Sequence, residues 1–146
     1  MKIVKLCSVT FRSEGIYVSS SNNTPYGLVE NIPMDRFAND VSPEVLGNRV
    51  LEVLASIPEA ILEIDLKSHG ELHREHLRSL GFENEDAFEK RARSLSVKKA
   101  GERLSVVPYE TYRTGGFVPI SDKAKFCSPE PEELGNLIFE QRNECR

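Results

Sequence analysis

The stretch from Ser42 to Ile57 carries the clearest periodic pattern of apolar residues in the chain. Ser42 is a residue type that caps a helix through its hydroxyl, and Pro43 suits the first helical position, where no backbone N–H is needed. Pro58 ends the pattern. Spacings of three and four place the apolar residues on one helical face: Leu46, Val50, Val53, Leu54 and Ile57. The pattern predicts a helix over 42–57 whose apolar stripe packs against the rest of the domain.

Alternation of apolar and polar residues predicts β-strands before this helix. Residues 2–12 and 16–20 alternate on either side of a turn signal at 13–15, which predicts a β-hairpin. The polar stretch 19–25 is typical of a turn, and a short third strand is expected over 28–32. After the helix, alternation returns in four segments: 95–97, 104–109, 117–120 and 125–127. These segments predict a strand pair and two further short strands.

Two further segments between the strands have helical features. Residues 71–80 carry apolar side chains on one side and stop at Gly81, and Gly70 indicates that this helix begins after position 70. Asn84 can cap a second helix that continues through Arg93. We therefore expect two helices between the central helix and the second group of strands.

The remaining segments complete the fold class. Residues 60–66 fit both a strand and a helix, and the two alternatives stay open. A last helix is expected after Ser128, with acids in its first turn, where they suit the helix dipole. Strands and helices occur in separate runs, which predicts an α+β fold with a mostly antiparallel β-sheet packed against several helices. A single domain over 1–146 is expected, because a chain of this length buries roughly two-thirds of its unfolded surface.

Composition narrows the class of protein. The chain is 39% hydrophobic and 29% charged, as in ordinary folded domains. No apolar run approaches the ~20 residues of a membrane span, and Lys5 and Arg12 interrupt the region where a signal peptide needs an apolar core. Cys7, Cys127 and Cys145 lie far apart and form no C-x-x-C pair, so free thiols are expected. We expect a cytoplasmic protein without a cofactor.

The formal net charge of −4 indicates which kind of partner the protein can bind. Proteins that bind nucleic acid through the phosphate backbone usually carry a basic surface, so direct binding of nucleic acid is not expected. An acidic protein suits a basic partner, because complementary charge speeds encounter and sharpens partner choice.

All three histidines lie within eight positions, at His69, His73 and His76. On one helix these spacings place three imidazoles on one face, where they can bind zinc and leave a fourth position for catalysis. Gly70 argues that the helix starts beyond His69, and the order differs from the H-E-x-x-H of zinc proteases. The structural alternative is a polar helix face with one half-buried histidine at position 76.

Two further clusters carry charge. Four acids in seven residues stand at the expected start of the 84–93 helix, where they suit the helix dipole or can form a docking surface for a basic protein: Glu83, Glu85, Asp86 and Glu89. Basic residues gather over 90–103, with Tyr109 and Tyr112 downstream, a combination that can bind single-stranded nucleic acid. Because the whole chain is acidic, a structural role at a helix end and a hairpin turn is favoured for the basic cluster.

The order of these segments resembles a known family. The carrying motifs are Ser-Val-Thr-Phe-Arg-Ser-Glu-Gly-Ile-Tyr-Val-Ser-Ser-Ser (8–21), Ser-Pro-Glu-Val-Leu-Gly-Asn-Arg-Val-Leu-Glu-Val-Leu (42–54), Leu-Gly-Phe…Ala-Phe-Glu-Lys-Arg-Ala-Arg (80–93) and Gly-Gly-Phe-Val-Pro-Ile (115–120). Over most of residues 3–120 the pattern is similar to the immunity proteins of bacterial contact-dependent growth inhibition (CDI) systems. The motifs contain no catalytic signature.

The resemblance implies a protein that is not an enzyme. It implies a cytosolic protein that binds and neutralises the C-terminal toxin domain of a cognate surface protein, often a nuclease, and it carries over no catalytic, cofactor or metal residues. We expect Glu83, Glu85, Asp86 and Glu89 to form the toxin-facing rim. Two alternatives stay open: a small metal-dependent hydrolase or nuclease using His69, His73 and His76, and an RNA-binding module using residues 90–103.

Overall fold

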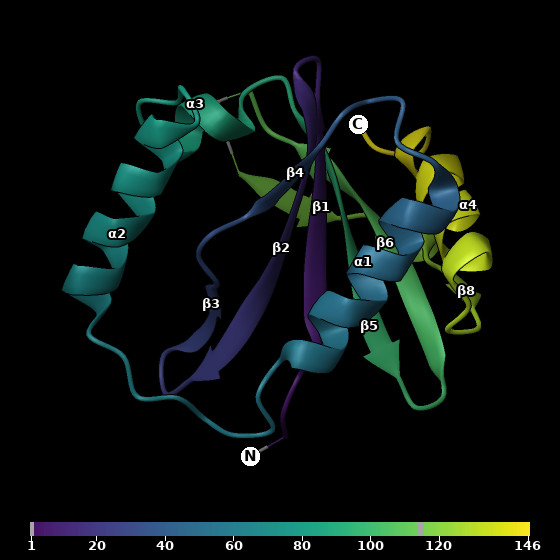
Figure 1. Ribbon diagram of the computed structural model, residues 1–146, viewed down its shortest axis with the longest axis horizontal. Helices are drawn as coiled ribbons and strands as arrows, with labels where there is room; N and C mark the ends of the chain where they lie inside the picture. The colour runs from purple at the N-terminus through teal and green to yellow at the C-terminus, as the bar shows by residue number, and fades with distance from the viewer. Residues whose placement is uncertain (1, 114–115) are drawn as a thin grey trace.

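Four antiparallel strands form the centre of the sheet. The computed structural model describes residues 2–113 and 116–146. In it, the central strands lie side by side in the order β2 (Gly15–Thr24), β1 (Leu6–Arg12), β5 (Arg93–Ala100) and β6 (Arg103–Thr111), as Figure 1 shows. The β1–β2 hairpin and the β5–β6 pair confirm two predictions from the alternation pattern.

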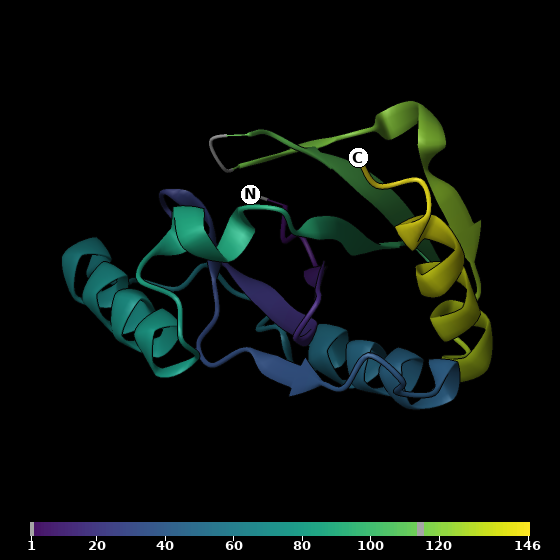
Figure 2. The same cartoon turned by 90° about the horizontal axis from the view of Figure 1, so that it is seen from above.

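Each outer strand of this group pairs with two short strands along its length. Residues 16–18 of β2 pair with β4 (Asp35–Phe37), and residues 21–24 pair with β3 (Gly27–Glu30). In the same way, β6 pairs first with β8 (Lys125–Cys127) and then with β7 (Phe117–Pro119). The described strands thus form one curled antiparallel sheet with the shape of a half-barrel (Figure 2).

Helices α1 (Pro43–Ser56) and α4 (Pro131–Arg142) pack against each other and cover one face of the sheet. The core lies between them and the apolar residues of the strands, among them Val9, Val18, Leu95, Val97 and Val106, all at most 1% exposed. The predicted α+β class is confirmed. Among the described helices, none is long and apolar enough to cross a membrane.

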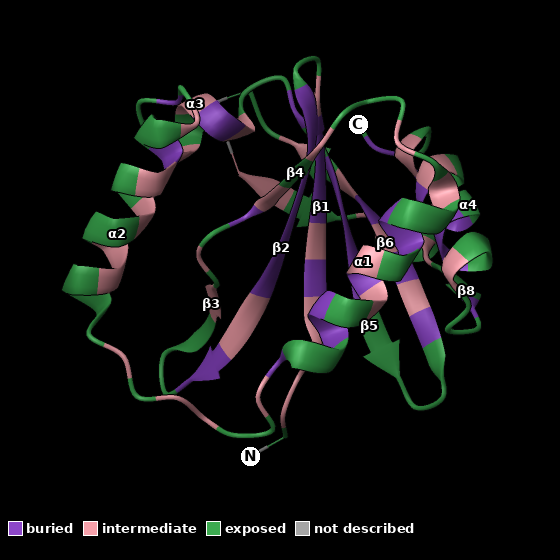
Figure 3. Ribbon diagram, viewed as in Figure 1, coloured by how far each residue is buried: buried purple, intermediate pink, exposed green. Residues whose placement is uncertain are grey.

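Helices α2 (Leu66–Ser79) and α3 (Glu85–Glu89) lie on the opposite side, away from α1 and α4 (Figure 1). A small apolar cluster attaches them to the sheet, with Phe82 and Phe88 meeting the ring of Tyr17 edge to face. Leu77 is the buried residue of α2, and most of this helix is exposed or half-buried (Figure 3).

Local capping explains where two helices begin. The Ser42 hydroxyl accepts a hydrogen bond from the Val45 N–H at 3.2 Å, which confirms the predicted start of α1. Asp65 caps α2 in the same way. The prediction that this helix begins after Gly70 is wrong, because the Asp65 cap starts it at Leu66 and one glycine inside a helix is tolerated.

Three other sequence predictions need correction. Residues 19–24 of the stretch expected to be a turn, 19–25, form the second half of β2, held by Asn23, whose side chain bonds both the N–H and the C=O of Val4 at 2.9 Å. Residues 60–65 are neither strand nor helix. The helix after Asn84 ends at Glu89 rather than Arg93, because the chain turns and β5 begins.

The remaining differences are small. The short strand β4 was not expected, and Gly115 of the quoted glycine pair lies outside the described residues. The expectation of three free thiols is confirmed, because Cys7, Cys127 and Cys145 are all unpaired and buried. Burial raises the pKa of the Cys7 thiol, which keeps it protonated and unreactive.

Candidate functional site

The face of the sheet opposite α1 and α4 is lined with buried hydroxyl groups. Strand register places Ser8 beside Ser19 and Ser96, and it places Thr10 beside Ser94. The Thr10 and Ser94 hydroxyls lie 3.2 Å apart, in hydrogen-bond contact. Four of these five residues are at most 6% exposed, so this polar face is covered by other parts of the chain.

A cavity of about 230 Å³ lies over three of these hydroxyls, those of Ser8, Thr10 and Ser94. The central strands form its floor, and β3, α3 and β7 supply its walls. Its lining residues are Ser8, Thr10, Ser21, Leu28, Glu30, Glu85, Phe88, Glu89, Ser94, Tyr109 and Phe117. We call it the carboxylate pocket, because three glutamates, Glu30, Glu85 and Glu89, are among its lining residues.

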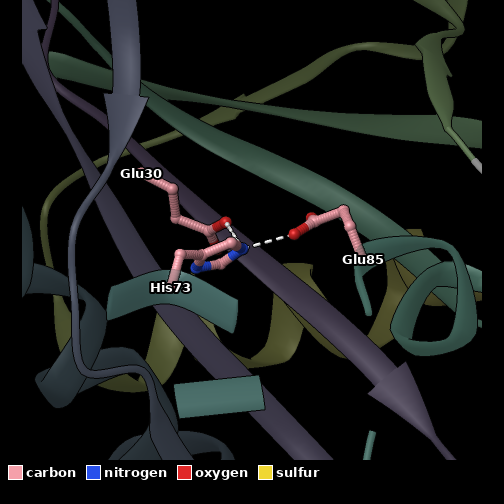
Figure 4. Close-up of side chains that lie close together, drawn as sticks. All are labelled: Glu30, His73 and Glu85. Atoms are coloured by element: carbon pink, nitrogen blue, oxygen red, sulfur yellow. Dashed lines mark hydrogen bonds and ion pairs between the residues drawn. The ribbon is translucent and has the colours of Figure 1, made fainter. Parts of the chain in front are cut away.

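Glu30, His73 and Glu85 converge from β3, α2 and α3 at one wall of this pocket (Figure 4). The Nε2 atom of His73 pairs with the Glu85 carboxylate and lies 3.7 Å from Oε2 of Glu30. The other oxygen of Glu30 accepts a hydrogen bond from the Ser19 hydroxyl at 2.7 Å. His73 is the most buried of the three, with 16% of its side chain exposed.

Each member of this group affects the charge of the others. The hydrogen bond that His73 donates to Glu85, together with the charges of Glu85 and Glu30, raises the pKa of His73 and favours its imidazolium form. Burial tends to raise the pKa of Glu85, but the hydrogen bond and charge of His73 outweigh it and lower that pKa. Burial raises the pKa of Glu30. One imidazolium thus stands beside two carboxyl groups.

Glu89 adds a third carboxyl group, one α-helical turn from Glu85. Its side chain accepts a hydrogen bond from the Gly116 N–H at 2.5 Å, which ties α3 to the start of the β7 region. Burial, together with the nearby charge of Glu85, raises the pKa of Glu89 to about 7, against the opposing effect of the Gly116 bond. Glu85 is therefore ionised beside the imidazolium of His73, whereas Glu30 and Glu89, whose pKa values are raised, are placed to ionise when a cationic group enters the pocket.

Arg12 at the end of β1 fixes α3 above the sheet. Its guanidinium donates to the backbone oxygens of Phe88 at 2.5 Å and Lys90 at 2.9 Å, and it lies 4.7 Å from the ring centre of Phe82. This clamp holds the C-terminal end of a helix only five residues long. It thereby positions the glutamates of α3 over the pocket.

The Glu30–His73–Glu85 group is also the set of described side chains suited to a metal ion, with ligand atoms within 4.8 Å of one another. A metal-bound histidine normally donates its second ring N–H to a protein group or to water. In the described structure, Nδ1 of His73 is buried without such a partner. The contacts of His73 Nε2 with the Glu85 and Glu30 carboxyl groups are those of an ion pair, which accounts for this group.

The three histidines of α2 do not converge. His76 accepts a hydrogen bond from the Met34 N–H at 3.1 Å, and burial lowers its pKa, so it is the half-buried neutral histidine of the structural alternative. His69 does not join the described set of closely spaced metal-ligating groups, which contains His73 alone of the three. All three histidines lie on α2 at the spacing of one helical face, but the ring of His73 contacts Glu30 and Glu85 rather than the other two histidines.

The predicted acidic rim divides into two pairs. Glu85 and Glu89 line the pocket, whereas Glu83 and Asp86 are exposed and lie outside its lining. Sequence reasoning missed Glu30, because it falls on a short strand apart from the acidic cluster. It also missed the hydroxyl floor, although the signal was present: serine or threonine occupies positions 8 and 10 of β1 and positions 94 and 96 of β5, between the apolar core positions.

Replacing Glu89 by glutamine is expected to flatten the dependence of stability on pH. A pKa of about 7 in the folded state, above the ordinary value of 4.5, means that the folded protein binds more protons than the unfolded chain between these values. The free energy of unfolding must therefore fall as pH rises from about 4.5 to about 7, and Glu89→Gln removes this contribution. Urea unfolding at pH 5 and pH 8 measures the difference; parallel pH profiles for both proteins would contradict it.

Comparison with solved structures shows where this fold occurs. The chain is similar to a protein of unknown function from Neisseria meningitidis, with a TM-score of 0.76 and 16% identity over 100% of this chain and 98% of the other. It is also similar to a chain in the CdiA-CT/CdiI toxin and immunity complex from Yersinia pseudotuberculosis, with a TM-score of 0.78 and 14% identity over 99% and 98% of the two chains. No family model and no curated protein matches the sequence. At these identities the likeness shows the fold.

Proposed function

We propose that this protein is an immunity protein that binds and neutralises the toxin domain of a CDI system. The observation that carries the proposal is the carboxylate pocket, in which Glu30, Glu85 and Glu89 stand over a floor of buried hydroxyls on the face of the sheet opposite α1 and α4. The fold supports it, because one similar chain occurs in a toxin and immunity complex. The resemblance of the sequence motifs points to the same family.

The chemistry of the pocket suits a basic protein. Partly buried carboxylates gain strongly from a lysine or arginine of a partner, because the pair forms away from water. The net charge of −4 adds long-range attraction to a basic domain, and a nuclease presents such a basic surface to its own substrate. Binding there would place an acidic protein against the surface that the toxin uses for nucleic acid.

The proposal predicts a tight complex with the toxin domain of the cognate CDI system. Co-expression of the two is expected to yield a 1:1 complex in size-exclusion chromatography and to restore the growth of cells that produce the toxin domain. Raising the salt concentration should slow association more than it speeds dissociation, because long-range attraction is screened. Failure to form a complex even at low salt, with both proteins folded, would refute the proposed function.

A further inference from the structure

A second, larger cavity of about 420 Å³ lies where the α3–β5 connection meets the end of β6. Five of its eight lining residues are cationic, and the full lining is Lys90, Arg91, Ala92, Arg93, Thr111, Tyr112, Arg113 and Arg146. We call it the basic cavity. It adjoins the carboxylate pocket in the chain, because Glu89 lines one and Lys90 lines the other.

Hydrogen bonds from Thr111 to two backbone oxygens assemble the basic cavity from three distant segments. The Thr111 hydroxyl donates to the Ala92 oxygen at 2.7 Å, and the Thr111 N–H donates to the Arg146 oxygen at 2.7 Å. Between Lys90 and Ala92 the chain turns at Arg91, which has a φ of +62°, in the left-handed region that a non-glycine residue rarely adopts. An uncommon backbone conformation thus lies at the wall of the cavity.

The cations of the basic cavity have no acidic partners in the described structure. The ion pairs of the described residues lie outside the cavity and use other basic residues, such as Lys5, Arg49 and Lys125. The nearest acid in sequence, Glu89, instead accepts a hydrogen bond from Gly116. The basic cavity thus concentrates positive charge on a protein whose net charge is −4, and a cleft lined by one sign of charge attracts ligands of the opposite sign.

We propose that the basic cavity binds the phosphate backbone of a single-stranded nucleic acid. Arginine side chains dominate the lining, and their planar forks match phosphate oxygens in pairs. Tyr112 stands among them with 53% of its surface exposed, and it offers a ring on which a base can stack. Cations that follow a backbone, combined with an exposed aromatic ring, are the elements of sequence-independent binding to single strands.

This inference goes beyond the proposed function and does not depend on it. The expectation that this chain does not bind nucleic acid rests on the net charge of the whole protein. The basic cavity, in contrast, gathers five cationic residues at one place on the surface. Its ligand is opposite in charge to the group expected in the carboxylate pocket. One protein can therefore hold a basic protein element and a nucleic acid strand at neighbouring sites.

The test uses the full chain and a fluorescein-labelled uridine 12-mer, with binding followed by fluorescence anisotropy. We expect binding that weakens steeply between about 50 and about 300 mM salt, with a log–log slope of about −2 to −3, as for three or four phosphates neutralised on a single strand. The double variant Arg91→Glu/Arg93→Glu should lower the affinity at least about tenfold, and Tyr112→Ala about fivefold or more.

A matched control separates the cavity from net charge. Lys67→Glu/Arg74→Glu makes the same change in charge on the exposed face of α2 and should alter RNA affinity less than about twofold. Circular dichroism checks that each variant is folded. The proposal is overturned if the wild type does not bind the RNA, if the two double variants behave alike, or if a glutamate 12-mer peptide binds as tightly as RNA, which would point to an acidic protein segment instead.

Discussion

Replacing Gly135 by alanine is expected to destabilise the protein by about 3 kcal/mol or more, a large share of the ~5–15 kcal/mol typical of whole domains. A Cβ atom on Gly135 would lie 1.7 Å from the Pro43 oxygen, and one on Gly47 would lie 1.9 Å from the Pro131 oxygen. These partners are backbone atoms at the starts of α1 and α4 and cannot rotate away. The two helices would have to separate and open the core that they share with the sheet.

The consequence should be a fall of about 10 °C in the unfolding temperature, since about 1 kcal/mol corresponds to a few degrees for a chain of this size. Gly70→Ala is the matched control, because Gly70 lies inside α2 with no atom within 4 Å of an added Cβ. There the same substitution should stabilise the helix by about 0.5–1 kcal/mol. Similar unfolding temperatures for the two variants would contradict the close α1–α4 contact.

This contact also shows where sequence reasoning stops. The cap at Ser42, the proline at the first helical position and the apolar stripe are local signals, and they predicted α1 correctly. The glycines at 47 and 135 carry no local signal of their own. Their role arises only when two helices that are far apart in sequence cross, so it belongs to the tertiary structure.

Some strands could likewise be predicted from local patterns, whereas another part of the sheet depends on contacts with distant residues. Alternation predicted the β1–β2 and β5–β6 pairs, because a residue's face is set by its own strand. The polar composition at the end of β2 predicts a turn, since the partners that stabilise the strand, Val4 and the residues of β3, lie elsewhere in the chain. Polar residues fit a strand when distant groups satisfy them, and composition alone does not show this.

The site was predicted in part for the same reason. Glu85 and Glu89 form an acidic cluster within α3, and proximity in sequence was enough to select them. Glu30 and His73 join them only through the fold, by way of β3 and α2. The spacing of the histidines suggested metal chemistry, but which groups His73 faces is decided by the helix position, and it faces two carboxylates.

The double substitution Glu30→Gln/Glu89→Gln should weaken binding of the toxin domain by about 30-fold to several thousand-fold. Removing one side of a desolvated charge pair costs about 2–5 kcal/mol, since the partner's cation is left buried without compensation. Glutamine keeps the shape of each side chain and can still accept the hydrogen bonds from Ser19 and Gly116. The fold should therefore persist, and the loss should appear mainly as faster dissociation in surface plasmon resonance.

The control for this variant is Glu83→Gln/Asp86→Asn, which also removes two carboxyl groups, but from exposed positions outside the pocket. Acids outside the pocket act only at long range, so this control should slow association slightly and leave the dissociation rate unchanged. If both variants lose affinity equally, the acidic cluster acts as a diffuse field and the pocket has no special role. If only the pocket variant does, the specificity lies with carboxylates that the fold brings together from β3 and α3, and partner choice depends on tertiary structure more than on the acidic run in the sequence.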